Sequence, residues 1–205
     1  MENYDLMSEN FDTEERIERS KIFADEFRNH ITDDSKNKSA IEFGCGTGLV
    51  GFELINEFNS TTFIDSSNGM IKQVEQKLFN MGIEKSRAIC CDLMKTMQRN
   101  LSADYVFSSL VLHHIIETEF ILTRLFNLLN KNGRLLIIDV DTDAGNFHAH
   151  RSDFNGHNGF EQIYLTDLCE KIGFCKTEIK TFYHGCRVVN GNEKPYSLFI
   201  MDSVK

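Results

Sequence analysis

Residues 41–48 read Ile-Glu-Phe-Gly-Cys-Gly-Thr-Gly and decide the fold of this chain. An apolar run breaks there into three glycines at every second position, and Glu42 stands two residues before the first of them. Glycine tolerates the positive φ that a sharp turn often needs, and its missing Cβ lets backbone N–H groups approach a ligand directly. Apolar residues at helical spacing follow from Leu49 to Phe58. The glycines are therefore predicted to join a strand to a helix, where α/β sheets bind nucleotides.

Strand and helix patterns alternate along the rest of the chain. Strands are predicted at 41–43, 60–64, 87–91, 103–109 and 134–140. Helices are predicted from about residue 14, over 70–78, over 120–129 with a glycine-terminated end near 133, and over 160–172 with an end at Gly173. Two more strands, 177–183 and 196–202, are joined by a polar loop containing Pro195. The alternation requires a parallel sheet covered on both faces, and the last two strands require an antiparallel hairpin.

Length and charge limit the classes of function. The 205 residues fit one domain, and a hydrophobic content of 41 % is enough for a substantial core. The net charge of −9 argues against a nucleic-acid partner, because such binding places Lys and Arg against phosphates. The start of the chain is polar and acidic, and no run approaches the ~18 apolar residues of a membrane span. We therefore expect a soluble cytoplasmic protein without a membrane partner, whose oligomeric state the sequence does not indicate.

The six cysteines are scattered along the chain, without a Cys-x-x-Cys pair. Free Cys behaves as a small hydrophobe, so buried thiols are expected. A thiol cluster for a metal or metalloid is the alternative, but nothing in the spacing asks for one. No metal site is predicted.

The motif Glu42 to Gly48 resembles the first motif of class I S-adenosylmethionine (SAM) dependent methyltransferases, and the later spacing resembles that family over nearly the whole chain. The resemblance implies a three-layer α/β fold of Rossmann-like type, with a mostly parallel seven-stranded sheet and an antiparallel C-terminal strand. It implies a single domain over residues 1–205, with residues 1–35 as an N-terminal lid and helix and residues 36–205 as the core. It also implies SAM as the cofactor and methyl transfer to a small-molecule acceptor.

The resemblance also implies a set of cofactor-binding residues. Asp65 follows Gly46 by close to the ~20 residues expected for an acid that accepts hydrogen bonds from ribose hydroxyls. Its alternative role is to cap the helix that follows, although Ser66 or Ser67 could cap it instead. In the resembled family, Asp92 and Leu93 would meet adenine, and the backbone beyond the fourth strand would contact the methionine part of SAM. The complete predicted set is Glu42, Gly44, Cys45, Gly46, Gly48, Asp65, Ser66, Met70, Asp92, Leu93, Ser109 and His113.

The catalytic residue stays open at this stage. An amine or hydroxyl nucleophile must lose a proton, and His113, His148, His157 and Asp141 are candidates to take it. Tandem histidines such as His113 and His114 are more often structural than catalytic in small-molecule methyltransferases.

Two segments are candidates to face the acceptor. The polar segment 141–157 follows the fifth strand, at the edge where α/β sheets place ligands. Its histidines could alternatively chelate a metal, but no ligand pair has a helical i, i+4 spacing. In the resembled family the N-terminal segment covers the cofactor, so Tyr4, Phe11, Arg16 and Arg19 could face the ligand. A solvated helix edge is the alternative for each of them, and Asp12 or Thr13 would cap the helix.

The same glycines allow a rival interpretation. Gly46, Gly48 and Gly51 fit the G-x-G-x-x-G fingerprint of dinucleotide binding, which would indicate an NAD-dependent oxidoreductase. Three observations weigh against this interpretation. Gly44 lies at a position that would still belong to the strand in the dinucleotide-binding fold. Asp92 has an adenine role only in the methyltransferase interpretation, and the sequence shows no second mononucleotide-binding half. A SAM-binding module without catalysis is the third possibility, since fold does not dictate function.

Overall fold

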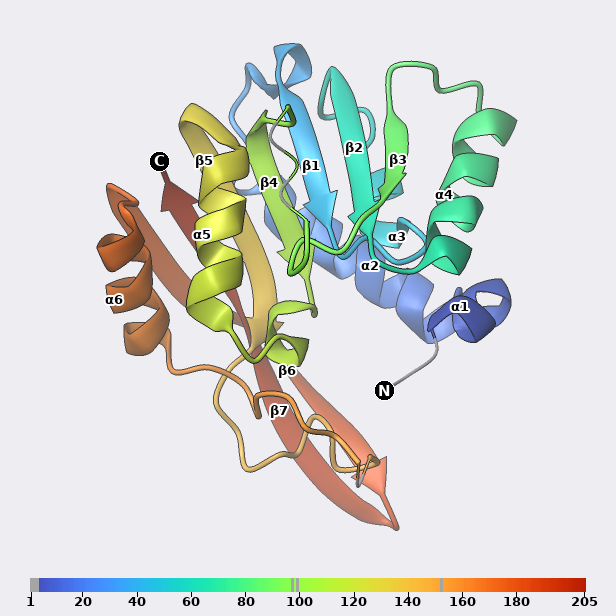
Figure 1. Ribbon diagram of the computed structural model, residues 1–205. Helices are drawn as coiled ribbons and strands as arrows, with labels where there is room; N and C mark the ends of the chain where they lie inside the picture. The colour runs from blue at the N-terminus through green and yellow to red at the C-terminus, as the bar shows by residue number, and fades with distance from the viewer. Residues whose placement is uncertain (1–3, 97, 99, 152) are drawn as a thin grey trace.

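The computed structural model describes residues 4–96, 98, 100–151 and 153–205, so residues 1–3 of the predicted lid and Ser152 of the segment 141–157 lie outside the described residues. Its centre is a seven-stranded sheet in the order β3-β2-β1-β4-β5-β7-β6 (Figure 1). All neighbouring pairs are parallel except β5 with β7 and β7 with β6. The strands are β1 (Ser39–Phe43), β2 (Ser60–Asp65), β3 (Arg87–Cys90), β4 (Ala103–Ser109), β5 (Leu129–Val140), β6 (Lys176–Val189) and β7 (Asn192–Val204).

Helices cover both faces of the sheet. The described α-helices are α1 (Tyr4–Met7), α2 (Glu14–Arg28), α3 (Leu49–Glu53), α4 (Asn68–Asn80), α5 (Thr118–Leu128) and α6 (Gln162–Ile172). One apolar cluster joins α5 and α6 to residues such as Ile41 and Val106. A second joins α2 and α3 to Phe107 and Ile138, and a third packs α4 against Phe63. The three-layer α/β fold with a mostly parallel seven-stranded sheet is therefore confirmed.

The glycine turn has the backbone conformation that its sequence requires. Gly44, Gly46 and Gly48 have φ of 66°, 53° and 81°, in the left-handed region that side chains disfavour. Gly44 is also crowded, because a Cβ there would lie 2.4 Å from Cγ2 of Val111. The turn therefore brings the end of β1 close to the segment that follows β4.

Three predicted boundaries were wrong. The helix α5 ends at Leu128 without a glycine cap, and β5 begins at Leu129 rather than at residue 134. The left-handed residue there is Asn132, with φ of 62°. Gly133 lies inside β5 and allows close packing, since a Cβ would lie 2.9 Å from a backbone oxygen. The helix α6 begins at residue 162 because Phe160 forms a parallel bridge with Asp141 instead.

The predicted polar loop between the last two strands is replaced by a long hairpin. The strands β6 and β7 continue to Asn190 and Gly191, whose φ of 51° and 76° fit a two-residue type I′ turn. Pro195 therefore lies inside β7, opposite Cys186. Its carbonyl oxygen accepts a hydrogen bond from Nδ2 of Asn146 at 3.0 Å. The end of the hairpin extends beyond the carboxyl ends of the parallel strands (Figure 1).

The six cysteines are free thiols, but only half of them are buried. Cys45, Cys91 and Cys169 are buried as expected, whereas Cys90, Cys175 and Cys186 are exposed. The last two lie near or on β6, the edge strand of the sheet, so alternate residues there face solvent. Among the described residues, no helix is long and apolar enough to cross a bilayer.

Candidate functional site

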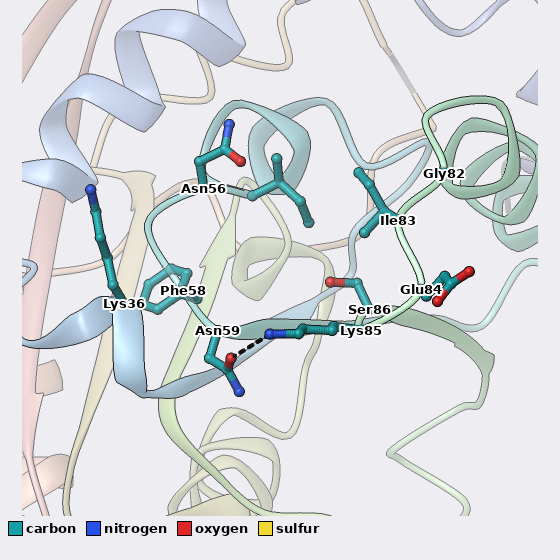
Figure 2. A pocket seen from close by; sticks show the side chains of 10 residues that line it. Lys36, Asn56, Phe58, Asn59, Gly82, Ile83, Glu84, Lys85 and Ser86 are labelled. Carbon is teal, nitrogen blue, oxygen red and sulfur yellow. Dashed lines mark hydrogen bonds between the residues drawn. The ribbon is translucent and has the colours of Figure 1, made fainter.

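The main cavity, of about 880 Å³, lies at the carboxyl ends of the parallel strands. It is bounded by the glycine turn after β1, the ends of β2, β3 and β4, α2, and parts of the segment 141–157 and the hairpin. Figure 2 shows a smaller hollow of about 410 Å³, lined by Lys36, Asn59, Lys85 and their neighbours. That hollow lies where β2 and β3 begin and contains no predicted site residue. The main cavity is therefore the candidate site.

The main cavity brings together eleven of the twelve predicted cofactor-binding residues. Gly48 is the exception, because it is packed under the rings of Phe52 and Phe63, with a Cβ position 2.9 Å from Phe52. The eleven that line the cavity are Glu42, Gly44, Cys45, Gly46, Asp65, Ser66, Met70, Asp92, Leu93, Ser109 and His113.

Glu42 is a fully buried acid at the floor of this cavity. Burial raises the pKa of its carboxyl to about 8, although the Gly51 backbone N–H opposes this shift. Among the described residues its Oε2 has no hydrogen-bond partner. Gly51 must lack a side chain here, because a Cβ would lie 2.3 Å from Oε2 of Glu42. The cavity thus contains a buried polar oxygen that a ligand could satisfy.

Asp65 lies at the carboxyl end of β2, facing the glycine turn. Its two carboxylate oxygens accept hydrogen bonds from the backbone N–H of Gly46 and of Ser67, each at 2.8 Å. Burial raises its pKa, and these backbone N–H groups oppose that effect. The hydroxyl of Ser67 caps α4 by accepting from the N–H of Met70 at 3.2 Å, so Asp65 is not the helix cap. The capping alternative for Asp65 is therefore wrong.

Asp92 and Leu93 follow β3 at the same edge. Asp92 accepts a hydrogen bond from the Met94 N–H at 2.9 Å and pairs with Lys95 at 2.9 Å. The hydrogen bond from Lys95 lowers the pKa of Asp92, so the carboxylate is ionised at neutral pH. Leu93 is buried and supplies an apolar surface next to it. A carboxylate beside an apolar surface suits a flat ring with an amino group.

His113 forms a buried pair with Asp139. Its Nδ1 lies 2.6 Å from Oδ1 of Asp139, and the two side chains are 1 % and 0 % exposed. Asp139 also accepts from the backbone N–H of Val140 and of His113, as an ionised carboxylate would. This arrangement places the ring proton on Nδ1 of His113. Its Nε2 is buried without a hydrogen-bond partner among the described residues.

His148 also lines the cavity and is 8 % exposed. Burial, together with the neighbouring His113, His114, Arg151 and His150, lowers its pKa to about 3. At neutral pH its ring is therefore uncharged. Neither ring nitrogen has a hydrogen-bond partner among the described residues.

The other two candidate bases lie outside the cavity lining. His157 Nε2 lies 3.1 Å from the carbonyl oxygen of Ile115, and Asp141 accepts from Gln162 at 2.7 Å and from Thr181 at 2.9 Å. Both side chains hold the segment 141–157 to its neighbours. The described residues contain no group of three His, Cys, Asp or Glu side chains arranged to hold a metal ion.

The N-terminal segment lies against the glycine turn and α4. Asp12 accepts from the hydroxyl of Thr47 and pairs with Lys77 at 2.7 Å. Asp5 accepts from the Ser67 hydroxyl at 2.6 Å and the Gly69 N–H at 2.8 Å. Thr13 caps α2, as predicted. Of the four residues expected near the ligand, Phe11, Arg16 and Arg19 line the cavity and Tyr4 does not.

Sequence reasoning missed Arg151, Phe147 and Arg187, which also line the cavity. Arg187 lies on β6, in the stretch that was predicted as a polar loop. The Asn190-Gly191 pair between alternating residues was the available signal, since that dipeptide favours tight hairpins.

Comparison with known proteins agrees with this architecture. The model of a family described as a methyltransferase domain matches residues 34–198. An uncharacterized methyltransferase of Schizosaccharomyces pombe is 29 % identical over 156 residues, and the match covers 69 % of this chain and 55 % of that protein. A malonyl-[acyl-carrier protein] O-methyltransferase of Ilyobacter polytropus is 25 % identical over 144 residues, covering 69 % and 54 %. The chain spans about half the length of these curated relatives.

Solved structures share the fold at low identity. Phosphoethanolamine N-methyltransferase 2 of Haemonchus contortus, with phosphomonomethylethanolamine and S-adenosylhomocysteine, has a TM-score of 0.73 at 15 % identity, covering 89 % of this chain and 52 % of that one. Magnesium protoporphyrin IX methyltransferase of Synechocystis, with S-adenosylhomocysteine, has a TM-score of 0.65 at 14 % identity, covering 93 % and 83 %. Because the family model matches most of its length, the chain belongs to this family of methyltransferase domains.

Proposed function

We propose that this chain transfers the methyl group of SAM to a small-molecule acceptor. The observation that carries the proposal is the meeting of Glu42, Asp65 and Asp92 around the glycine turn in one cavity. Membership of the methyltransferase domain family supports the same conclusion.

The cavity fits SAM in size and chemistry. Its volume of about 880 Å³ lies within the range of about 300 to 1,000 Å³ of ligand pockets. The Asp65 carboxylate suits the two ribose hydroxyls, and Asp92 with Leu93 suits adenine. The unpaired Oε2 of Glu42 is a buried polar atom on the same side. Carboxylates on this side also favour a ligand that carries the positive charge of a sulfonium.

Little activation is required of the protein. A methyl group bound to a positively charged sulfur is already electrophilic, so the chain has to hold the acceptor in line and remove its proton. Positioning alone can contribute about 7 to 11 kcal/mol to such a reaction.

We assign proton removal to His113. Its Nδ1–H is held by Asp139, so Nε2 carries the lone pair, and this atom is buried just behind the cavity lining without a partner among the described residues. His148 is the weaker candidate, because a pKa of about 3 makes it a poor base. An acceptor hydroxyl or amine within hydrogen-bond reach of Nε2 would lose its proton to His113 as the methyl group arrives.

Binding and turnover test the proposal separately. Calorimetry with SAM, S-adenosylhomocysteine and NAD should give tight binding of the first two and none of NAD. Folded protein that binds no SAM below millimolar concentration would contradict the proposal, and NAD binding would favour the oxidoreductase alternative. Binding of SAM without transfer to any acceptor would leave a non-catalytic SAM-binding module. Preference for a carrier protein or a folded RNA over every small molecule tested would contradict the small-molecule acceptor.

A further inference from the structure

The main cavity is lined by side chains of opposite charge. Asp65 and Asp92 lie at the ends of β2 and β3, and four arginines line the same cavity from α2, the segment 141–157 and β6. We call these four residues the arginine wall: Arg16 and Arg19 on α2, Arg151 in the segment 141–157, and Arg187 on β6. The wall is notable in a chain with a net charge of −9.

Arg187 is held in place by aromatic rings. Its guanidinium lies 4.7 Å from the centroid of Phe147 and 5.8 Å from that of Tyr196. Its Nε is buried and has no hydrogen-bond partner among the described residues. A buried donor without a partner is costly, so this nitrogen is suited to a ligand that accepts a hydrogen bond.

Arg19 is a second largely buried cation, with 19 % of its side chain exposed. Burial lowers the pKa of Arg19; Glu15 and Tyr196 oppose this shift, and the nearby charges of Arg187 and Arg16 add to it. Its ion-pair partner, Glu15, lies 3.4 Å away and is 78 % exposed, so solvent weakens that pair. Arg19 and Arg187 are therefore near enough to each other for their charges to interact.

His148 adds neutral hydrogen-bonding groups to the cavity. Burial, together with His113, His114, Arg151 and His150, lowers its pKa to about 3, and both of its ring nitrogens lack hydrogen-bond partners among the described residues. A neutral ring can donate to, or accept from, a polar ligand. The wall thus combines fixed cations with neutral hydrogen-bonding groups.

We propose that the methyl acceptor carries an anionic group, a carboxylate or a phosphate, which Arg187 and Arg19 bind. The inference rests on the proposed function, because it concerns the second substrate of the same cavity. Guanidinium groups match the planar oxygens of such anions and bind them more strongly than neutral groups. The anion anchors the acceptor at these arginines, and its nucleophilic atom faces His113.

Arg16 belongs to the other ligand. Its guanidinium lies 4.0 Å from the centroid of the Phe11 ring, and that ring would lie 3.4 Å from a Cβ on Gly46. Arg16 therefore stands beside the glycine turn and suits the carboxylate of SAM itself. The experiment has to separate these two anions.

The first test uses inorganic phosphate as the probe, with protein saturated by S-adenosylhomocysteine. Histidine ring proton shifts should change on titration with phosphate but not with sodium chloride at equal ionic strength. Arg187→Gln should weaken phosphate binding ten-fold or more and leave the affinity for S-adenosylhomocysteine unchanged. Lys176→Gln, the same charge change at the other end of β6, where Lys176 is 61 % exposed, is the matched control and should have no effect.

The second test measures turnover with matched acceptors, each offered as a carboxylic acid and as its primary amide. The acids should be methylated with at least ten-fold higher kcat/KM, and Arg187→Gln should remove that preference through KM. Arg187→Lys should restore part of the preference for acids. An unchanged melting temperature of both variants would show that the site still folds. Equal use of acids and amides would overturn the proposal, as would an Arg187→Gln effect confined to SAM affinity. Failure to bind SAM at all would instead overturn the proposed function. Phosphate titration of the free protein would in that case still measure whether the arginine wall binds an anion.

Discussion

Glu42 makes the stability of this fold depend on pH. The folded protein keeps a proton on this carboxyl up to about pH 8, whereas the unfolded chain loses it near 4.5. The folded state therefore binds more protons between these values, and the free energy of unfolding falls as pH rises from about 4.5 to 8. We expect Glu42→Gln to remove this decline, on the order of a few kcal/mol at pH 8, and to matter little near pH 4.5. Urea unfolding of both proteins across this range measures it, and parallel curves would contradict the assignment.

Asp65 should couple cofactor binding to the glycine turn. Asp65→Asn replaces one acceptor oxygen with a donor, so it loses a bond to ribose and one to Gly46 or Ser67. Charge-assisted bonds of this kind contribute about 1.5 to 3 kcal/mol each. We expect SAM affinity to fall at least ten-fold in calorimetry, together with a lower melting temperature. Asp104→Asn is the control, because Asp104 holds Ser39 at the opposite end of the sheet, and it should lower stability alone. Unchanged SAM affinity in Asp65→Asn would rule out the ribose role.

The His113 pair should control the chemical step. His113→Gln should lower kcat about 10² to 10⁴-fold while SAM still binds. Asp139→Asn should also lower kcat, since the ring would lose the acceptor that holds its proton on Nδ1. His157 lies outside the cavity lining, so His157→Gln should keep the full kcat. Retention of kcat in His113→Gln, measured at saturating SAM, would leave the acceptor proton to solvent or to another group.

Residues next to the glycine motif could be predicted from the sequence, because their positions follow from strand ends. Asp65 and Asp92 each end a strand of one parallel sheet, so they had to meet at one edge. Asp139 escaped detection because it lies inside an apolar strand, where only its contact with His113 reveals a role. Arg187 escaped because its stretch was interpreted as a loop.

At the scale of elements, two aspartates fasten the N-terminal segment: Asp5 holds it to the start of α4, and Asp12 holds it to the glycine turn and to Lys77 in the last turn of α4. Asp12→Ala would remove both the Thr47 and the Lys77 contact, so the segment should open more often. A cover that excludes water and positions the acceptor would be weakened, so we expect faster SAM release and lower turnover. Stopped-flow binding and steady-state rates measure both, with Asp34→Ala as a control, since it breaks a similar pair with Lys38 far from the cavity. Unaltered release would mean that the segment does not cover the cofactor.

The ends of β1 to β4 could be predicted to within two residues, while the start of β5 and the hairpin could not. Buried parallel strands read as continuous apolar runs, which makes their ends clear in β2 and β4. In the hairpin, residues alternate between exposed and half-buried along β6, and polar side chains such as His184 and Arg187 interrupt the pattern. Its register depends on the Asn190-Gly191 turn and on the partners of β7, which are tertiary features.

At the scale of the whole molecule, the cavity is assembled from segments far apart in the sequence. The carboxylates come from consecutive strand ends, whereas the arginines need α2, the segment 141–157 and the hairpin to meet. Phe23 of α2 contacts Phe182 of β6 with ring centroids 6.4 Å apart, which fixes part of that meeting. Local sequence patterns predict the positions of the carboxylates, but they do not predict that the arginines come together.

Pro195 has a consequence for self-association. Towards the tip of the hairpin from Ser197, β7 no longer pairs with β5, and Asn146 of the segment 141–157 lies at that edge instead. The Pro195 carbonyl points to that edge and accepts from Asn146, and the ring nitrogen beside it has no hydrogen to donate. Pro195→Thr would restore a donor at the edge, and sedimentation velocity should then detect stronger concentration-dependent association than in the unaltered protein. Equal association of the two proteins would show that the only proline of the chain does not protect this edge.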